Sequence, residues 1–378
     1  MKQIQMVDLR SQYDAIKEEI NSGIQSVLDT ATYVKGGKVK EFQQHLEEYL
    51  GVKHVIPVGN GTDALQISLM ALGLKPGDEV ITPTFTFAAT AEVVALLGLT
   101  PVLVDVEPDY FSISIQALEN AITPNTKAIV PVHLYGQNAN MDEVLAIARK
   151  HHLYVVEDAC QSIGAKYTFN DGSVGRSGCM GHIGCTSFFP SKNLGCYGDG
   201  GALFTNDDDL AAKIRAIANH GMSVRYHHDL IGVNSRLDSI QAAVLDVKLR
   251  HLDQYIENRK KAARFYDEAL KNNPHIILPA RNPKSEHTFH QYTIRVTGIN
   301  RDMVQSRLAE KNIPAMIYYP IPLHLQKAYQ DERYRKGDFP VAEQLAQTVL
   351  SLPMHTELTE EQLHYITDNL LQILDSVK

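Results

Sequence analysis

The stretch from about residue 50 to residue 205 alternates short apolar runs with segments of helical periodicity. The apolar runs are typical of buried strands and lie at Val55–Val58, Val80–Ile81, Val102–Val106, Ala128–Val132, Tyr154–Glu157, Thr186–Phe189 and Ala202–Thr205. The helical patterns between them lie at Asp63–Leu72, Ala88–Leu97, Ile115–Ile122 and Met141–Lys150. Strands that alternate with helices predict crossover connections and a mostly parallel sheet with helices on both faces. The sequence therefore predicts an α/β fold for this part of the chain.

The pattern changes after about residue 207. Apolar residues three and four apart, with charges between them, predict one long helix over Leu237–Asp267. Beyond Pro274, shorter alternating runs and further helical patterns predict a smaller α+β lobe. We expect an N-terminal helix that packs with the small domain, a large domain and a small C-terminal domain, in residues 1–30, 31–250 and 251–378.

Composition and charge narrow the class of protein. The 378 residues include 44% apolar and 21% charged residues, which is ordinary for a globular protein. The net charge of −8 disfavours a general surface for nucleic acid or for an anionic membrane. The longest uncharged apolar run, Val93–Val104, is interrupted by Gly98 and Pro101, and the N-terminus has no apolar signal segment. We expect a cytoplasmic protein that binds neither nucleic acid nor membrane.

Metal binding is poorly supported by the sequence. The four cysteines, at positions 160, 179, 185 and 196, form no CxxC pair. The histidine pairs at 151–152 and 227–228 are adjacent, so their side chains point to different sides of a helix or a strand. We expect reduced cysteines and no metal site.

Ligands of open α/β sheets bind beyond the carboxyl ends of the strands, and candidate chemistry follows several predicted strands. The turn Gly59–Thr62 precedes a helix whose N-terminus could bind phosphate, with Thr62 or Asp63 as its cap. This turn lacks the spacing of a P-loop or a dinucleotide fingerprint, so it also fits an ordinary connection between strand and helix. Asp158 directly follows a buried run, where it either caps the next segment or faces a cationic ring nitrogen.

Lys192 lies in the segment SFFPSKNLGCYGDGGALF, residues 187–204. A lysine in a partly desolvated pocket loses proton affinity and becomes a nucleophile that can form a Schiff base. The alternative is a lysine in a surface loop, but the aromatic residues before it and the glycines after it favour a pocket. A lysine, a carboxylate and a helix terminus are together what pyridoxal 5'-phosphate requires for its aldehyde, ring nitrogen and phosphate.

With these residues in place, the chain resembles the DegT/DnrJ/StrS sugar-nucleotide aminotransferases, which are pyridoxal-phosphate enzymes of the aspartate-aminotransferase fold type. The matching stretches run from residue 59 to residue 326 and are GNGTDAL, GDEVITPTFTFAAT, VPVHLYGQ, VVEDACQSIGA, TSFFPSKNLGCYGDGGALFTND, GVNSRLDSIQAA and YYPIPLHLQ. The resemblance implies a three-layer fold with a mostly parallel central sheet and a smaller C-terminal α+β domain. It also implies pyridoxal 5'-phosphate as cofactor and a homodimer with shared active sites.

The resemblance implies a role for individual residues. Lys192 would bind the cofactor aldehyde and move the proton in catalysis, while Asp158 would keep the ring nitrogen protonated. Gln161 would bond the ring hydroxyl, and Phe87 would lie on the ring face. The phosphate would be held by Gly61, Thr62, Ser187 and, from the neighbouring subunit, Asn234. Lysine at position 192, where a dehydrating branch of the family has histidine, argues for amino transfer.

The implied substrates are L-glutamate, which becomes 2-oxoglutarate, and a UDP-linked keto-sugar. Arg236 is the first candidate to bind a carboxylate, with an ion pair to Asp238 as its alternative role, and Arg225 is the second. His324 and Tyr319 are expected either at the sugar or in packing between the lobes.

Four segments, SFFPSKNLGCYGDGGA, RYHHDLIGVNSRLD, YPIPLHLQ and SLPMH, most resemble the branch that aminates C3 of UDP-2-acetamido-2-deoxy-3-keto-glucuronic acid, for bacterial surface polysaccharide such as O-antigen. The alternative substrate is a dTDP-3-keto-6-deoxyhexose, which lacks the carboxylate. The segment Tyr167–Gly181 is longer than this resemblance implies and could reshape the pocket rim. Two other classes stay open, a nicotinamide oxidoreductase, which the missing dinucleotide pattern disfavours, and a non-catalytic regulator that binds the cofactor.

Overall fold

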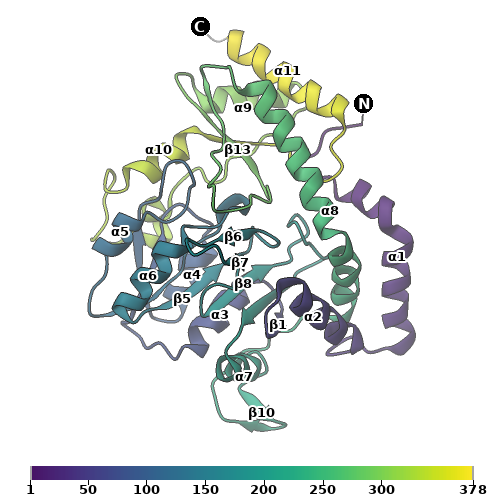
Figure 1. Cartoon of the computed structure of the whole chain (residues 1–378), viewed down its shortest axis with the longest axis vertical. Coiled ribbons are helices and arrows are strands. Elements are labelled where there is room, and N and C mark those ends of the chain that lie inside the picture. Colours follow the sequence, from purple (N-terminus) through teal and green to yellow (C-terminus); the bar gives the residue numbers. More distant parts are fainter. Residues whose placement is uncertain (1, 377–378) are drawn as a thin grey trace.

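The computed structural model describes residues 2–376, so residue 1 of the expected N-terminal segment and residues 377–378 of the expected small domain lie outside it (Figure 1). At its centre is a seven-stranded sheet with the order β1-β9-β8-β5-β4-β2-β3. The strands are β1 (His54–Val58), β2 (Glu79–Pro83), β3 (Thr100–Val104), β4 (Thr126–Ile129), β5 (Tyr154–Asp158), β8 (Ile183–Ser187) and β9 (Gly201–Thr205). Strand β9 is antiparallel to both neighbours, whereas the pairs from β8 to β3 are parallel. The expected mostly parallel sheet is confirmed.

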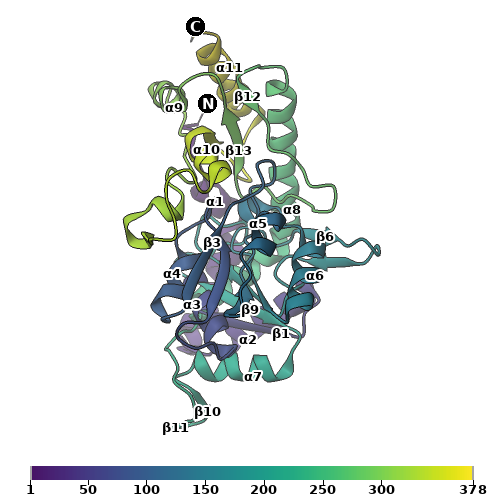
Figure 2. The ribbon, with the colours of Figure 1, turned by 90° about the vertical axis from the view of Figure 1, so that its left-hand side faces the viewer.

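Helices cover both faces of this sheet (Figures 1 and 2). One face carries α3 (Gly61–Ala71), α4 (Ala89–Leu96) and α7 (Asp208–Ile217). The other carries α2 (Gly37–Leu50), α5 (Ile115–Asn120), α6 (Met141–His151) and the first half of α8 (Ser239–Leu270). Consecutive strand residues alternate between the two cores, as Val155 and Val156 do. Because both faces are buried, the strands appear in the sequence as continuous apolar runs.

The smaller lobe is built on a three-stranded antiparallel sheet. Its strands are β12 (Ile276–Ile277), β13 (Tyr292–Val296) and β14 (Val349–Leu352). The helices of this lobe are α9 (Arg301–Glu310), α10 (Pro340–Thr348) and α11 (Glu360–Ser376). The second half of α8 contributes Tyr266 and Leu270 to its core. Strands and helices therefore combine here in the α+β arrangement that the sequence predicts.

Helix α8 connects the two lobes. It spans 32 residues, so the expected domain boundary at residue 250 lies inside it. Helix α1 (Leu9–Thr30) packs on the first half of α8, where Ile16 and Ile20 meet Val244 and Val247. A loop that bonds to α8 is therefore anchored to an element that both lobes share.

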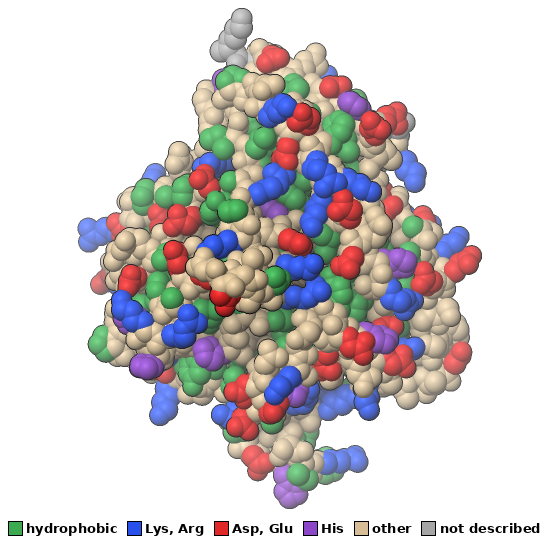
Figure 3. All heavy atoms as spheres, viewed as in Figure 1, with side chains coloured by type: hydrophobic (Ala, Val, Ile, Leu, Met, Phe, Trp, Pro, Cys, Tyr) green, Lys and Arg blue, Asp and Glu red, His purple; other side chains and the backbone are tan. Residues whose placement is uncertain are grey.

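Two short hairpins lie outside the main sheet. Strand β6 (Lys166–Thr168) pairs with β7 (Val174–Arg176), and β10 (Met222–Val224) pairs with β11 (His227–His228). The second hairpin extends from the lower end of the molecule in Figures 1 and 2. On the face seen in Figure 3, acidic and basic side chains are interspersed. Between residues 2 and 376, every helix is too short or too polar to cross a lipid bilayer.

Candidate active site

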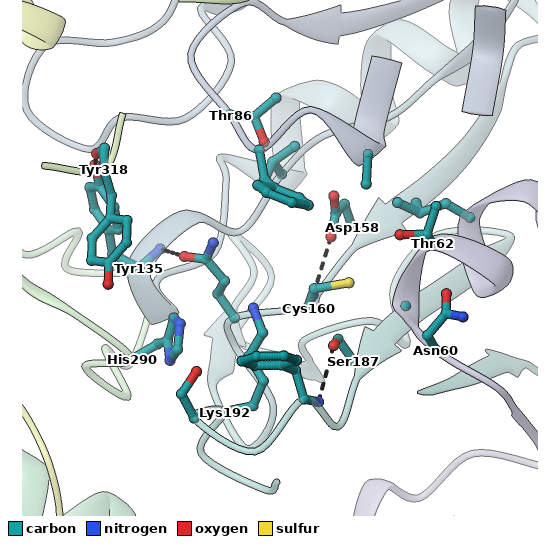
Figure 4. A pocket seen from close by; sticks show the side chains of 18 of the residues that line it. Asn60, Thr62, Thr86, Tyr135, Asp158, Cys160, Ser187, Lys192, His290 and Tyr318 are labelled. Atoms are coloured by element: carbon teal, nitrogen blue, oxygen red, sulfur yellow. Dashed lines mark hydrogen bonds between the residues drawn. The ribbon is translucent and has the colours of Figure 1, made fainter. Parts of the chain in front are cut away.

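A cavity of about 760 Å³ lies at the carboxyl ends of β5 and β8 (Figure 4). The first turn of α3 and the loop after β8 line it from the large lobe, and residues 290–291 and 318–319 line it from beyond α8. In Figure 4, Asn60, Thr62 and Ser187 lie toward one end of this space, whereas His290 and Tyr318 lie toward the other. The cavity is therefore where the strand order of an α/β sheet predicts a ligand.

The first turn of α3 forms one end of the cavity. Its N-cap is Asn60, whose Oδ1 accepts the N–H of Asp63 at 2.8 Å, so the expectation of a cap at Thr62 or Asp63 is wrong. A Cβ added to Gly61 would lie 2.7 Å from the Cβ of Ser187 and 3.0 Å from the Sγ of Cys160. Only glycine lets the helix start this close to β8. The free N–H groups of this turn and the helix dipole make it suitable for a phosphate.

Asp158 is the last residue of β5 and is only 6% exposed. Its Oδ2 accepts the hydroxyl of Thr90 at 2.8 Å, and its Oδ1 accepts the N–H of Cys160 at 3.2 Å. A turn rather than a helix follows, so Asp158 is not a helix cap. Among the described residues it forms no ion pair. A buried carboxylate with two hydrogen-bond donors and no ion pair is suited to a cationic N–H from a ligand.

Lys192 lies in the loop after β8 and is partly buried in the cavity wall. Its backbone N–H donates to the carbonyl of Phe189 at 2.8 Å. Burial lowers the pKa of the Lys192 ammonium, and the negative charge of Asp158 opposes this shift only in part. A lowered pKa increases the fraction of free amine at neutral pH, so Lys192 can act as a nucleophile and as a proton acceptor.

Gln161 and two aromatic residues form the wall between these groups. The Oε1 of Gln161 accepts the N–H of Tyr135 at 2.8 Å, and its Nε2 donates to the hydroxyl of Tyr319 at 3.2 Å. Phe87 is 56% exposed although it lines the cavity, and its ring lies 6.2 Å from that of Tyr319. A bound planar ring would cover this exposed apolar face.

The described residues fit the groups of pyridoxal 5'-phosphate. The cavity brings together an amine of lowered pKa, a buried carboxylate that forms no ion pair with a described residue and a helix start that a single Cβ would block. These can serve the aldehyde, the ring nitrogen and the phosphate of the cofactor, respectively.

The sequence analysis missed residues that the cavity includes. Asn60 and Cys160 are neighbours of predicted site residues, so their positions could have been inferred. His290 and Gln291 carry no such signal, because only the meeting of the two lobes brings them to the cavity. Burial, together with the charges of Lys192 and Arg259, keeps the pKa of His290 well below its ordinary value, so its ring is neutral.

Four predicted residues do not line this cavity. Asn234 is exposed and pairs by a bridge with Asn219, while Arg225 lies on the projecting hairpin, 4.9 Å above the ring of Tyr226. Arg236 forms no ion pair with Asp238 or any other described residue.

The Nη2 of Arg236 instead donates to the Nε2 of His220 at 3.3 Å. His324 is buried, with its ring nitrogens 2.9 Å from the hydroxyl of Thr84 and 3.2 Å from a carboxylate oxygen of Glu343. Contact of Asn234 with the cofactor phosphate stays a prediction, as does contact of Arg225, Arg236 and His324 with the substrate. The long segment Tyr167–Gly181 forms the β6–β7 hairpin, and none of its described residues lines the cavity.

Known proteins match the chain over nearly its whole length. A model of the DegT/DnrJ/EryC1/StrS aminotransferase family matches residues 14–371. The Pseudomonas aeruginosa protein named UDP-2-acetamido-2-deoxy-3-oxo-D-glucuronate aminotransferase is 50% identical over 356 residues, which cover 94% of this chain and 96% of that protein. A Geobacillus stearothermophilus protein named pleiotropic regulatory protein is 45% identical over 374 residues, covering 98% of each chain. The crystal structure of a DegT DnrJ EryC1 StrS aminotransferase from Brucella abortus has a TM-score of 0.92 at 44% identity, covering 98% of this chain and 99% of that one.

Proposed function

Because the chain belongs to the DegT/DnrJ/EryC1/StrS aminotransferase family, whose enzymes use pyridoxal 5'-phosphate, we propose that it transfers the amino group of L-glutamate to C3 of a UDP-linked 3-keto-sugar. The observation that carries this proposal is the meeting of Lys192, Asp158 and the first turn of α3 in one cavity. The sugar we propose is UDP-2-acetamido-2-deoxy-3-keto-glucuronic acid, a precursor of surface polysaccharide such as O-antigen. The 50% identity to the Pseudomonas aeruginosa enzyme supports this choice.

The proposed chemistry divides between the cofactor and two side chains. When bound, the cofactor carries the amino group and takes up the electrons that remain when a proton leaves the substrate carbon. Lys192 holds the cofactor through its amine and, when displaced, moves the proton at the reacting carbon. Its lowered pKa supports both roles, since one nitrogen must accept and return a proton near the working pH. Asp158, oriented by the hydroxyl of Thr90, keeps a proton on the ring nitrogen.

The remaining cavity residues hold the cofactor in the orientation that this chemistry needs. The N–H groups of Gly61 and Thr62, with the hydroxyls of Thr62 and Ser187, bind the phosphate. The Nε2 of Gln161 would donate its second N–H to the ring hydroxyl, because one N–H is directed at Tyr319 and the Oε1 already accepts the N–H of Tyr135. Phe87 covers one face of the ring.

The cavity of one chain has the wrong charge for its substrates. Both glutamate and the sugar nucleotide are anions, whereas the described lining residues include one ammonium, that of Lys192, and the carboxylates of Asp63, Glu92, Asp158 and Asp199. Such a cavity repels anions. We infer that a second copy of the chain supplies the missing positive charge.

Two cations near Asn234, the residue expected to come from the second copy, support this inference. Arg236 and Lys35 form no ion pair with a described carboxylate; Lys35 donates to the side chain of Asn219 at 2.7 Å. Burial and the nearby Arg236 lower the pKa of Lys35, which places two cations close together. We propose a homodimer in which Asn234 of one copy reaches the phosphate in the other, and Arg236 the substrate carboxylate.

Mixing two variants that are each inactive or severely impaired with the uronate substrate tests the shared site. Lys192→Ala and Arg236→Ala chains, unfolded together and refolded, should regain about one quarter of the parental activity, because half of the dimers are mixed and each of these has one intact site. Separate variants refolded alone provide the control. No recovery in the mixture would exclude sharing of these two residues between copies.

Arg236 also offers a test of the sugar. We propose that its guanidinium binds the uronate carboxylate, so Arg236→Ala should lower kcat/KM for the uronate far more than for the same UDP-sugar with a hydroxymethyl group at C5. Equal losses for both sugars would show that Arg236 does not bind the sugar carboxylate. A dTDP-3-keto-6-deoxyhexose remains the alternative substrate and belongs in the same assay.

The second candidate function is that of a non-catalytic regulator that binds the cofactor. The name of the Geobacillus stearothermophilus relative, pleiotropic regulatory protein, favours testing this alternative. A regulator would bind the cofactor without turnover. The deciding experiment combines the purified protein, pyridoxal 5'-phosphate and glutamate, and measures release of 2-oxoglutarate in a single turnover. A panel of UDP- and dTDP-keto-sugars then identifies the acceptor by mass spectrometry of the product. Failure to release 2-oxoglutarate would refute glutamate as donor, and failure with every donor and sugar would leave the regulator.

The cysteines support a reducing, cytoplasmic location for this reaction, because all four are free in the structure. Cys185 and Cys196 are buried.

A further inference from the structure

A second lysine lies next to the loop that carries Lys192. Lys248 is on α8 and is 1% exposed. Its Nζ donates to the carbonyl of Gly195 at 2.8 Å and lies 4.7 Å from the ring centroid of Tyr197. It forms no ion pair with a described carboxylate. A buried ammonium without a counter-ion costs free energy, so its presence needs an explanation.

The loop between β8 and β9 is fixed to α8 at two adjacent points. Gln241, two helical turns before Lys248, accepts the N–H of Tyr197 at 2.8 Å and donates to the carbonyl of Tyr197 at 3.3 Å. Gly195 lies so close to the start of the loop that an added Cβ would come within 2.4 Å of the carbonyl oxygen of Pro190. The carbonyl that Lys248 binds is therefore part of a tightly closed loop, three residues beyond Lys192.

The small lobe holds the same loop from the other side. Asn193 is 4% exposed, and its Nδ2 donates to the carbonyl of Thr288 at 3.0 Å. Lys192 thus lies beside a residue bonded to the small lobe and before residues bonded to α8. If the bond at Gly195 were lost, the loop would keep its attachments at Asn193 and Tyr197 but would lose the attachment that lies between these two residues.

We propose that Lys248 is a positioning residue that fixes the Lys192 loop through the Gly195 carbonyl and so directs the Lys192 amine into the cavity. This inference rests on the role proposed for Lys192. An apolar side chain could fill the same space without the cost of a buried charge. What it could not supply is the donor that the Gly195 carbonyl needs. Lys248 therefore serves the geometry of the site at the expense of stability.

Lys248→Met tests this inference, with Lys261→Met, an exposed lysine on the same helix, as the matched control. Amide hydrogen exchange of residues 188–200 should accelerate in Lys248→Met and not in the control, while the melting temperature of the cofactor-loaded protein should not fall. In steady-state kinetics kcat should drop by about tenfold or more with KM nearly unchanged, because even a small displacement of a reacting group lowers the rate of the chemical step. Lys248→Gln, which keeps an N–H donor, should recover part of the loss.

Two results would overturn the proposal. One is unchanged exchange of the loop or unchanged kcat in Lys248→Met. The other is a lower melting temperature with faster exchange throughout the protein, which would make Lys248 a general structural residue. Hydrogen exchange decides the question even if the protein transfers no amino group, so failure of the proposed function and failure of this inference are distinguishable.

Discussion

The Lys248→Met variant should be more stable than the parent protein at pH 7 and less stable near pH 10.5. Burial lowers the pKa of the Lys248 ammonium to about 8, from an ordinary value of 10.5. This difference of about 2.5 pKa units lowers the free energy of unfolding by about 3 kcal/mol at any pH where Lys248 is protonated in both the folded and the unfolded state. Methionine occupies a similar volume without the charge.

The sign of the effect follows from proton binding. The unfolded chain keeps the ordinary pKa, so between about pH 8 and pH 10.5 it binds more protons than the folded protein, and the contribution of Lys248 to stability rises with pH. The penalty is complete below this window and absent above it. Methionine removes the penalty but leaves the Gly195 carbonyl without its donor, which costs about 1 kcal/mol. We therefore expect the variant to gain about 2 kcal/mol at pH 7 and to lose about 1 kcal/mol near pH 10.5.

Urea unfolding of both proteins at pH 7, 8, 9, 10 and 10.5 measures this difference, at fixed concentrations of protein and cofactor. Groups that titrate alike in both proteins cancel when the variant is compared with the parent at each pH. The thiol of Cys196 is an exception, because burial raises its pKa to about 11 while the charge of Lys248 lowers it, so a Cys196→Ala background removes its contribution. Lys261→Met should give a difference that does not change over this range. A Lys248→Met variant that is less stable than the parent at pH 7, or a difference independent of pH, would refute the reasoning.

Three further predictions concern the cavity. Lys192→Ala should still bind the cofactor but give no cofactor–peptide adduct after borohydride reduction; an adduct on another lysine in the parent protein would remove Lys192 from its role. Asp158→Asn, which keeps the shape and loses the charge, should lower kcat by about a hundredfold or more, and an effect of only a few-fold would contradict a charge on the ring nitrogen. Gly61→Ala should raise the Kd for pyridoxal 5'-phosphate by about tenfold or more in equilibrium dialysis, because its methyl group would lie 2.7 Å from the Cβ of Ser187 and overpacking costs about 1–3 kcal/mol. Unchanged affinity would exclude this turn as the phosphate site.

The sheet and the position of the site could be predicted from the sequence, because both depend on local patterns. Apolar runs of two to five residues indicated the strands, since a strand buried on both faces carries mostly apolar side chains. The rule that ligands bind at the carboxyl ends of parallel strands then selected Asp158 and Lys192, which the structure places in one cavity. The helix cap was wrong, because Asn60, Thr62 and Asp63 are all good capping residues within four positions, and only the backbone geometry distinguishes them.

Contacts between distant segments could not be predicted. His324 follows two prolines in a loop, and nothing in YYPIPLHLQ indicates that its ring bonds to Thr84, which lies 240 residues away in the sequence. The same limit applies to His290, which reaches the cavity from the small lobe, and to Lys248, whose helical pattern does not distinguish a buried lysine from an exposed one. A periodic pattern identifies the face of a helix but not what that face meets.

The charges of the described residues support the proposed homodimer. The described lining of the cavity has an excess of carboxylates although the proposed substrates are anions, while Arg236 and Lys35 lie outside it and form no ion pair with a described carboxylate. The nearby hairpin leaves Tyr226 74% exposed, and Ile231 is 88% exposed in the segment that follows it. Large apolar side chains gain about 1.5–3 kcal/mol each when they are buried, which favours a partner surface over them. A second copy placed there would cover these side chains and could bring the cations to the carboxylate-rich cavity, so the same contact would serve both assembly and substrate binding.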